Sequence, residues 1–318
     1  MSTVIPSKHI FRASQHEWAW EMFQQHEELH WLPEEVPMMD DIRDWKERAT
    51  FDQTQFVKNI MLFFTQADIE VCNTYIDEYL PQYRNELPIK AMLTSFAGRE
   101  GIHTKAYAYI VESLALGDAT FSEFLNDPVL LKIHNIMNKY KTNRGLKERF
   151  KAMCATSLLG EGVMLFGLFA KLLNFQRHNL FNGTCTIVAW SIRDEDLHVA
   201  GIAKLIKTDV AFAEIDAATK ARWFWEVHAE LAPLVKEFTT NCFDGKVIPG
   251  ITLDETLQFI DFQVARRVRQ ANIQEDFELP VNPFPWFDQI VGGVEDANFF
   301  ERRRTEYAKN NLVGDWGY

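Results

Sequence analysis

The spacing of hydrophobic positions along this chain is typical of α-helices. Residues 51–78, FDQTQFVKNIMLFFTQADIEVCNTYIDE, carry apolar side chains at helical spacing over about seven turns. The same period predicts helices over roughly 87–115, 144–174, 185–208, 214–240 and 252–273, with one or two shorter helices within 120–140. Alternation of the β type is scarce. The pattern therefore predicts an all-α protein.

Other stretches predict loops and ends. Residues 279–293, LPVNPFPWFDQIVGG, contain three prolines and two adjacent glycines, which is typical of irregular structure. The pattern becomes helical again over 297–309, and the last nine residues, NNLVGDWGY, predict a flexible tail at 310–318. No low-complexity linker divides the chain. Residues 1–309 are therefore expected to form a single helical domain.

Acids and histidines occupy helix faces that should be apolar. In EGIHTKAY, residues 100–107, the offsets of Glu100, His103 and Tyr107 place all three on one face of a helix. The segment RDEDLH repeats the spacing with Glu195 and His198. A third pair, Glu27 and His30 (27–30), lies in the polar run QQHEELHW, and we interpret it as a solvated helix face.

A single acid in apolar surroundings precedes each of the two informative pairs. Asp68 lies 32 residues before Glu100, and Glu161 lies 34 residues before Glu195. This internal repeat matches the ligand set of a dinuclear carboxylate site in a four-helix bundle. Four unpaired buried carboxylates would cost roughly several kcal/mol each, whereas two divalent cations offset their charge. Oxygen-rich ligation with one nitrogen per ion favours iron or manganese over structural zinc.

Charge and composition narrow the class of protein. The net charge of −12 argues against nucleic-acid or anionic-membrane partners, because phosphates would be repelled. The N-terminal segment has no signal-peptide pattern, and no run of 18 or more apolar residues predicts a membrane span. The four cysteines have no CxxC spacing. We expect a reduced, cytoplasmic protein.

Together these motifs resemble the small, radical-generating subunit of class I ribonucleotide reductase over nearly the whole chain. EGIHTKAY matches the family's E-x-I-H-x-x-x-Y helix, GEGVMLFG its apolar helix with E-G, and RDEDLH its R-D-E-x-L-H segment. The resemblance implies a ferritin-like four-helix bundle core with additional helices. It also implies two metal ions, with iron favoured and manganese as the alternative. The implied ligands are Asp68, Glu100 and His103 for one ion, and Glu161, Glu195 and His198 for the other.

The same resemblance implies a radical and a route for it. Tyr107 falls where the family holds its stable tyrosyl radical. The segment HWLPEEVPM, residues 30–38, is similar to the family's W-x-x-E-E-V segment, so Trp31 matches its electron-transfer tryptophan. Asp194 matches the acid that joins this tryptophan to the metal-bound imidazole, here His103.

The C-terminal part is similar to the family's subunit contact. In ANFFERRRTEYAKN, Tyr307 matches the interfacial radical-relay tyrosine, and Trp316 and Tyr318 offer aromatic anchors in a docking tail. The implied function is ribonucleoside-diphosphate reductase, active only with a large subunit, where a cysteine reduces ribonucleotides. The family also implies a homodimer.

Two other classes of protein remain open. A ferritin-like metal-binding or storage protein would use the same ligands, but it would need neither Trp31 nor Tyr307 nor an aromatic tail. A dinuclear-metal oxidase acting on a small or lipid-like substrate predicts an open channel to the metals. It would not explain the tail.

Overall fold

The structure, a computed structural model, describes residues 16–64, 66–117, 124–141 and 145–292. Within these ranges the regular structure is helical, which confirms the predicted all-α class. The α-helices are α1 (Glu17–Glu28), α2 (Met39–Arg43), α3 (Phe51–Phe64), α4 (Ala67–Thr74), α5 (Leu87–Ser113), α7 (Pro128–Lys139), α8 (Leu146–Met153), α9 (Phe166–Leu173), α10 (Asn182–Thr208), α11 (Val210–Ala213), α12 (Ala217–Phe243) and α13 (Leu253–Gln270). Short 3₁₀ or π elements are η2 (Pro33–Glu35), η3 (Asp44–Arg48), η4 (Tyr75–Tyr79), η5 (Leu80–Gln82), η6 (Phe124–Asn126), η7 (Cys154–Leu165) and η8 (Asn174–His178).

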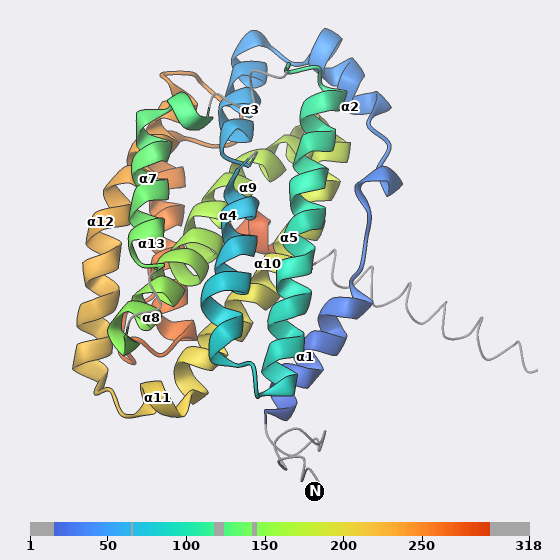
Figure 1. Cartoon of the computed structure of the whole chain (residues 1–318). Helices are drawn as coiled ribbons and strands as arrows, with labels where there is room; N and C mark the ends of the chain where they lie inside the picture. Colours follow the sequence, from blue (N-terminus) through green and yellow to red (C-terminus); the bar gives the residue numbers. More distant parts are fainter. Residues whose placement is uncertain (1–15, 65, 118–123, 142–144, 293–318) are drawn as a thin grey trace, which may run out of the picture.

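Four helical segments enclose the centre of the molecule. Around the ring, α4 packs on α5, α5 on α10, α10 on η7, and η7 on α4. Because α8, η7 and α9 follow one another without a break, they act as one rod through the core. Figure 1 shows α4 and α5 side by side, with α12 and α7 along the opposite flank. This ring is the four-helix bundle that the spacing of acids predicted.

Outer helices cover the bundle on both sides. Helix α1 packs against α5 and α10, whereas α12 and α13 pack against η7. The long members, α5 and α10, have 27 residues each, or about 40 Å of helix. Pro88 lies in the first turn of α5, where its missing N–H costs no hydrogen bond. Sites midway along these helices are therefore far from both ends of the bundle.

Two predicted elements were wrong, and a third was present but differs in its type of helix. The helix expected over 51–78 is two helices, because α3 ends at Phe64 and α4 begins at Ala67, with a turn in which Gln66 N–H donates to the Phe63 carbonyl (3.3 Å). The sequence shows no sign of this break, because it contains neither proline nor glycine there and the helical spacing of apolar residues continues across it. The helix expected over 144–174 contains a π segment, η7, within an unbroken apolar pattern. Residues 285–292 are helical, since a proline is well tolerated in a first turn.

One helical stretch, Leu146–His178, has the length and composition of a membrane span. Its most apolar window is buried entirely inside the protein. It is the central rod of the bundle, and its hydrophobicity reflects the surrounding helices. The segments predicted as a helix over 297–309 and a tail over 310–318 lie outside the described residues.

Candidate metal centre

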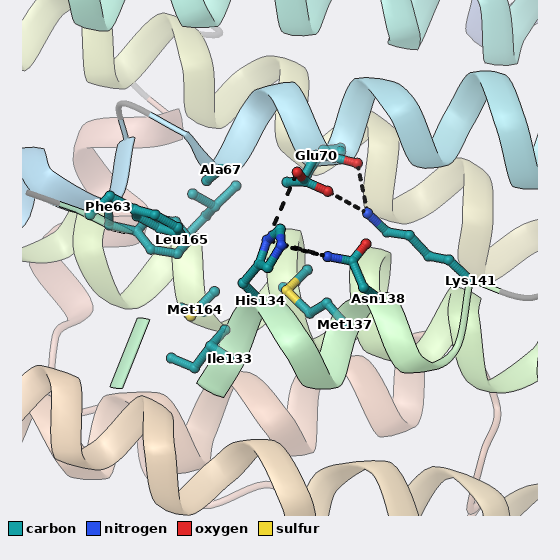
Figure 2. A pocket seen from close by; sticks show the side chains of 13 residues that line it. Phe63, Ala67, Glu70, Ile133, His134, Met137, Asn138, Lys141, Met164 and Leu165 are labelled. Atoms are coloured by element: carbon teal, nitrogen blue, oxygen red, sulfur yellow. Dashed lines mark hydrogen bonds and ion pairs between the residues drawn. The ribbon is translucent and has the colours of Figure 1, made fainter. Parts of the chain in front are cut away.

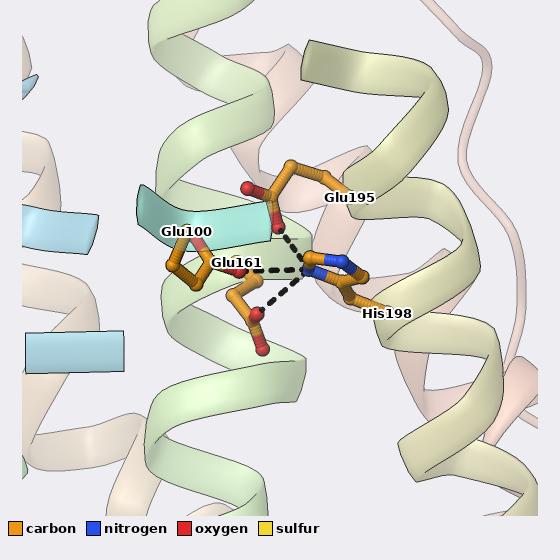
Figure 3. Close-up of side chains that lie close together, drawn as sticks. All are labelled: Glu100, Glu161, Glu195 and His198. Carbon is orange, nitrogen blue, oxygen red and sulfur yellow. Dashed lines mark ion pairs between the residues drawn. The ribbon is translucent and has the colours of Figure 1, made fainter. Parts of the chain in front are cut away.

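The six side chains predicted as ligands meet inside the four-helix ring. None of them is more than 1% exposed. They are Asp68 from α4, Glu100 and His103 from α5, Glu161 from η7, and Glu195 and His198 from α10. Figure 3 shows four of them converging from three helices. The sequence pattern therefore identified residues that share one buried location.

The six residues form two overlapping groups. Glu100, Glu161, Glu195 and His198 form one group, and Asp68, Glu100 and His103 form the other; within each, one potential ligand atom per residue lies within 4.8 Å of the others. Glu100 belongs to both groups. Two adjacent ions that share a carboxylate would fit this arrangement.

Two glutamates lie between the two imidazoles. Glu100 places one oxygen 2.9 Å from His198 Nδ1 and the other 3.4 Å from His103 Nδ1. Glu195 makes the same pair of contacts: Oε1 lies 3.1 Å from His103 Nδ1 and Oε2 lies 3.4 Å from His198 Nδ1. Glu161 reaches His198 alone, at 3.5 Å. In both histidines Nδ1 faces the carboxylates and Nε2 faces away from them.

The inner atoms of the cluster lack hydrogen bonds. Both carboxylate oxygens of Asp68, Glu100 and Glu195, and Nδ1 of both histidines, have no hydrogen-bond partner among the described residues. Buried polar atoms are nearly always satisfied, and burying a charge without compensation is expensive. Carboxylate oxygens and imidazole nitrogens are also the donor set of dinuclear iron and manganese sites. The cluster suits two metal ions.

The carboxylic acids of this cluster differ widely in their pKa values. Burial raises the pKa of Asp68 well above its usual range, and the charge of Glu100 adds to this. Burial raises the pKa of Glu161 to about 7. Burial acts in the same direction on Glu195, but the two imidazoles outweigh it and lower the pKa to about 2. Strongly separated pKa values in one buried cluster are typical of a functional site.

Glu161 is held by its helix and by a tyrosine. It lies in η7, a π segment, and such segments occur often at functional sites. Next to it, Gly162 allows a close approach: a Cβ there would lie 2.8 Å from Arg267 Nε, which donates to the Gly162 carbonyl. On the other side, the Tyr75 hydroxyl donates to the Glu161 carboxylate, at 3.0 and 3.2 Å.

Tyr107 is buried beside the cluster, one turn after His103. Its ring packs on Phe64 with centroids 4.4 Å apart. Its hydroxyl has no hydrogen-bond partner in the part of the chain that the structure describes. Burial raises the pKa of Tyr107 well above its usual range, and the charge of the Asp68 carboxylate raises it further. The Ser191 hydroxyl lowers this pKa, but by less. The phenol is thus isolated from solvent and strongly favours its neutral form.

Trp31, Asp194 and His103 form a hydrogen-bonded series. Trp31 Nε1 donates to Asp194 Oδ2 (2.7 Å), and His103 Nε2 lies 3.2 Å from the same oxygen. The indole also stacks on the His103 ring, with centroids 6.0 Å apart. Arg99 pairs with Asp194 at 3.1 Å and donates to the carbonyls of Leu29 and His26.

Three residues around the cluster were missed by the sequence reasoning. Tyr75 follows Asp68 by seven positions, the same offset that separates Tyr107 from Glu100, so this signal was available. Arg99 directly precedes Glu100 but could equally have been a surface charge. His26, buried and 3.1 Å from His198, lies in a polar run that gave no signal. Burial, with His198 adding to it, lowers the pKa of His26 to about 2.

A small pocket lies beside the cluster, between α4 and α7 (Figure 2). Ala67 and Gly160, neighbours of two cluster acids, line its inner part. At its rim Lys141 donates to Glu70 (2.9 Å). The pocket volume of about 30 Å³ has room for water molecules. Tyr307, Trp316 and Tyr318 lie outside the described residues.

Comparisons with known proteins point to one family. The family model "Ribonucleotide reductase, small chain" matches residues 9–283. A protein of Invertebrate iridescent virus 6, named as a probable ribonucleoside-diphosphate reductase small subunit, is 32% identical over 92% of this chain and 91% of its own.

Solved structures share the fold. The ribonucleotide reductase R2 subunit from Clostridium botulinum has a TM-score of 0.76 and 17% identity, over 89% of this chain and 91% of its own. An R2-like ligand-binding oxidase with a Mn/Fe cofactor has a TM-score of 0.71 and 14% identity, over 85% of this chain and 97% of its own. With the family match and the sequence relative above, this chain belongs to the family of ribonucleotide reductase small chains.

Proposed function

We propose that this chain is the small subunit of a class I ribonucleoside-diphosphate reductase and holds two metal ions in its bundle. The observation that carries the proposal is the convergence of four buried carboxylates and two imidazoles whose inner atoms, in the described residues, mostly lack hydrogen bonds. The proposed ligands are Asp68, Glu100, His103, Glu161, Glu195 and His198. Family membership supports the same function.

Iron is the favoured metal, with manganese as the alternative. When bound and oxidised by dioxygen or a species derived from it, two such ions would supply the oxidising equivalent for one-electron oxidation of a nearby tyrosine. Glu100 and Glu195 each face both imidazoles and would help to hold both ions. Asp68 and Glu161 hold the outer sides of the two positions.

Tyr107 is the proposed site of the stored radical. Its burial and its packing on Phe64 keep water and reductants away from the ring. Loss of an electron makes a phenol strongly acidic, so its proton has to move to a nearby acceptor. Asp68 exerts the strongest charge effect on this hydroxyl, and neither of its oxygens is hydrogen-bonded within the described structure. Asp68 is therefore the proposed proton acceptor.

The proposed route out of the centre runs through His103, Asp194 and Trp31. The 2.7 Å and 3.2 Å contacts on one Asp194 oxygen support this step. Beyond it, Tyr307 and a docking tail at 310–318, with Trp316 and Tyr318 as anchors, would connect the chain to a large catalytic subunit. Residues 1–309 would form one domain of a cytoplasmic homodimer.

The pocket in Figure 2 bears on the oxidase alternative. An oxidase that acts on an organic substrate needs room for that substrate beside its metals. The pocket next to Ala67 and Gly160, with a volume of about 30 Å³, fits water but not a lipid-like substrate. The storage alternative leaves the buried series of Trp31, Asp194 and His103 without a role. Both alternatives are therefore less well supported than the reductase.

The decisive experiment is electron paramagnetic resonance on aerobically purified protein, with metal content counted on the same sample. We expect two ions per chain and a tyrosyl signal that disappears in Tyr107→Phe and persists in Tyr75→Phe. Adding the cognate large subunit should give ribonucleoside-diphosphate reduction. A metal-based signal unaffected by Tyr107→Phe would remove Tyr107 from the proposal. Absence of reduction despite bound metal and an intact signal would favour storage or oxidase chemistry.

A further inference from the structure

The polar run interpreted as a solvated helix face contains a buried histidine. Glu27 and His30 are exposed, as expected, but α1 ends at Glu28, so His30 is not on the helix face. His26, beside Glu27, is fully buried on the inner face of α1. Its Nε2 lies 3.1 Å from Nε2 of His198, and its Nδ1 lies 2.7 Å from Ser95 Oγ on α5. Ser95 in turn donates to the Glu27 carboxylate, at 2.5 Å. A continuous series of contacts thus leads from His198 to the surface.

The number of available hydrogens determines which atom donates in each hydrogen bond of this series. Ser95 has a single hydroxyl hydrogen, which it donates to Glu27, so Ser95 Oγ accepts from His26 Nδ1. With its hydrogen on Nδ1, a neutral His26 has an acceptor at Nε2. His198 Nε2 therefore carries the hydrogen that it donates to His26. A neutral His198 then has its lone pair on Nδ1, the nitrogen that faces the Glu100 and Glu161 carboxylates.

The two histidines of the metal centre differ in the partner that contacts the outer nitrogen of the ring. His103 places its outer nitrogen directly against the buried Asp194 carboxylate, at 3.2 Å. His198 reaches a carboxylate only through a second imidazole and a hydroxyl. Outer partners of this kind set the tautomer and orientation of metal-binding histidines. His198 thus has an outer partner of its own, built from α1 and α5.

We propose that His26, Ser95 and Glu27 are positioning residues that hold His198 in the tautomer able to bind a metal ion through Nδ1. This inference rests on the proposed role of His198 as a ligand. The outer end is accessible, because Ser95 and Glu27 line a groove of about 520 Å³ between α1 and α5. A purely structural His26 would need only its packing on Phe96, at a centroid distance of 5.0 Å.

The test is a titration of Mn²⁺ into the metal-free full-length chain, with free Mn²⁺ measured by its paramagnetic resonance signal. Wild type should bind two ions. His26→Leu should weaken one of the two sites by about 10–100-fold, the range for outer partners of metal ligands, and leave the other unchanged. His26→Gln should recover most of the affinity, because its amide can both accept from His198 and donate to Ser95. His228→Leu, the same change in a half-buried histidine on α12, is the matched control and should bind normally.

Two further variants keep the test decisive. If His26→Leu fails to fold, Ser95→Ala interrupts the same series at a half-buried position and should weaken the same site by a smaller factor. In a His198→Gln background, His26→Leu should cause no additional loss. Unchanged binding in Ser95→Ala, or equal losses in His26→Gln and His26→Leu, would overturn the inference. Two intact sites in His198→Gln would instead contradict the proposed ligand set itself.

Discussion

Trp31 and Asp194, 163 positions apart in the chain, share a buried hydrogen bond of 2.7 Å between the indole nitrogen and one carboxylate oxygen. The same oxygen faces His103, so the acid lies between an aromatic ring and a candidate metal ligand. Arg99, itself 4% exposed, provides the opposite charge that a buried carboxylate needs. Indole, carboxylate and imidazole are thus held in fixed contact.

Replacing Trp31 by phenylalanine should separate electron transfer from metal binding. Trp31→Phe keeps an aromatic ring but removes the N–H that Asp194 accepts. We expect two bound ions and a turnover with the large subunit reduced by about 100-fold, the upper end for outer-partner changes. Trp190→Phe is the control, because Trp190 packs on Trp31 with centroids 5.4 Å apart but has no hydrogen bond to Asp194 among the described contacts. Full turnover in Trp31→Phe would exclude it from the route.

The two buried tyrosines should respond oppositely to loss of their hydroxyls. Tyr75→Phe removes a hydrogen bond to Glu161 and should lower the free energy of unfolding of the metal-free protein by about 1.5–3 kcal/mol, as for bonds to charged groups. Tyr107→Phe removes a hydroxyl that has no partner in the described structure, so stability should stay constant or rise. Urea unfolding of both variants measures the difference. Equal losses would show that Tyr107 has a hydrogen bond in solution.

Metal affinity should fall as the pH drops below 7. Burial raises the pKa of Glu161 to about 7, so at lower pH an incoming ion has to displace a proton from this carboxyl. Each displaced proton weakens binding by about tenfold per pH unit. Mn²⁺ titrations at pH 6 and pH 8 should show the difference, together with proton release into a weak buffer. A dependence that is equally steep in Glu161→Gln would assign it to other groups.

The destabilising effect of buried Lys171 should decrease as the pH rises toward 10.5. Its side chain is fully buried on α9, and the described residues offer it no carboxylate within ion-pair distance, only Thr239 Oγ1 at 3.3 Å. Burial lowers the pKa of Lys171 below its usual 10.5. The unfolded chain therefore binds more protons between the folded and unfolded pKa values. The penalty is complete below the folded pKa and disappears as the pH rises toward 10.5.

Lys171→Met should accordingly be more stable than wild type, by about 1–3 kcal/mol at pH 7. The gap in the free energy of unfolding should narrow as the pH approaches 10. Lys204→Met, at an exposed position on α10, serves as the control and should give a small gap at both pH values. A gap for Lys171→Met that widens with pH would contradict the buried-charge explanation.

The metal cluster was predictable because its residues conflict with their surroundings. An acid such as Glu161 inside an apolar run is costly unless something compensates it, and the two E-x-x-H pairs repeat at nearly the same interval. This conflict is local and visible in one dimension. Trp31 and Asp194 came instead from a family resemblance, since an ordinary tryptophan and an acid carry no such conflict.

Contacts made between distant segments could not be predicted in the same way. His26 lies among charged neighbours on α1, and its burial depends on how α1 packs against α5 and α10. The break between α3 and α4 could not be predicted from the local sequence either, because apolar residues continue at helical spacing across it. The π segment around Glu161 depends on tertiary packing, including the Arg267 side chain against Gly162. Local pattern identified the buried acids of the cluster, whereas tertiary packing determines the burial of His26 and the contacts that the buried residues make.

Arg99 contacts both outer networks of the metal centre. One guanidinium nitrogen pairs with Asp194, the partner of His103, and the other donates to the backbone carbonyl of His26, the partner of His198. The two networks therefore share one guanidinium group. Substitution of Arg99 would remove a contact from both networks at once, and its free-energy effect should not add to that of a substitution at Asp194, because the coupling energy for residues in direct contact is about 0.5–3 kcal/mol.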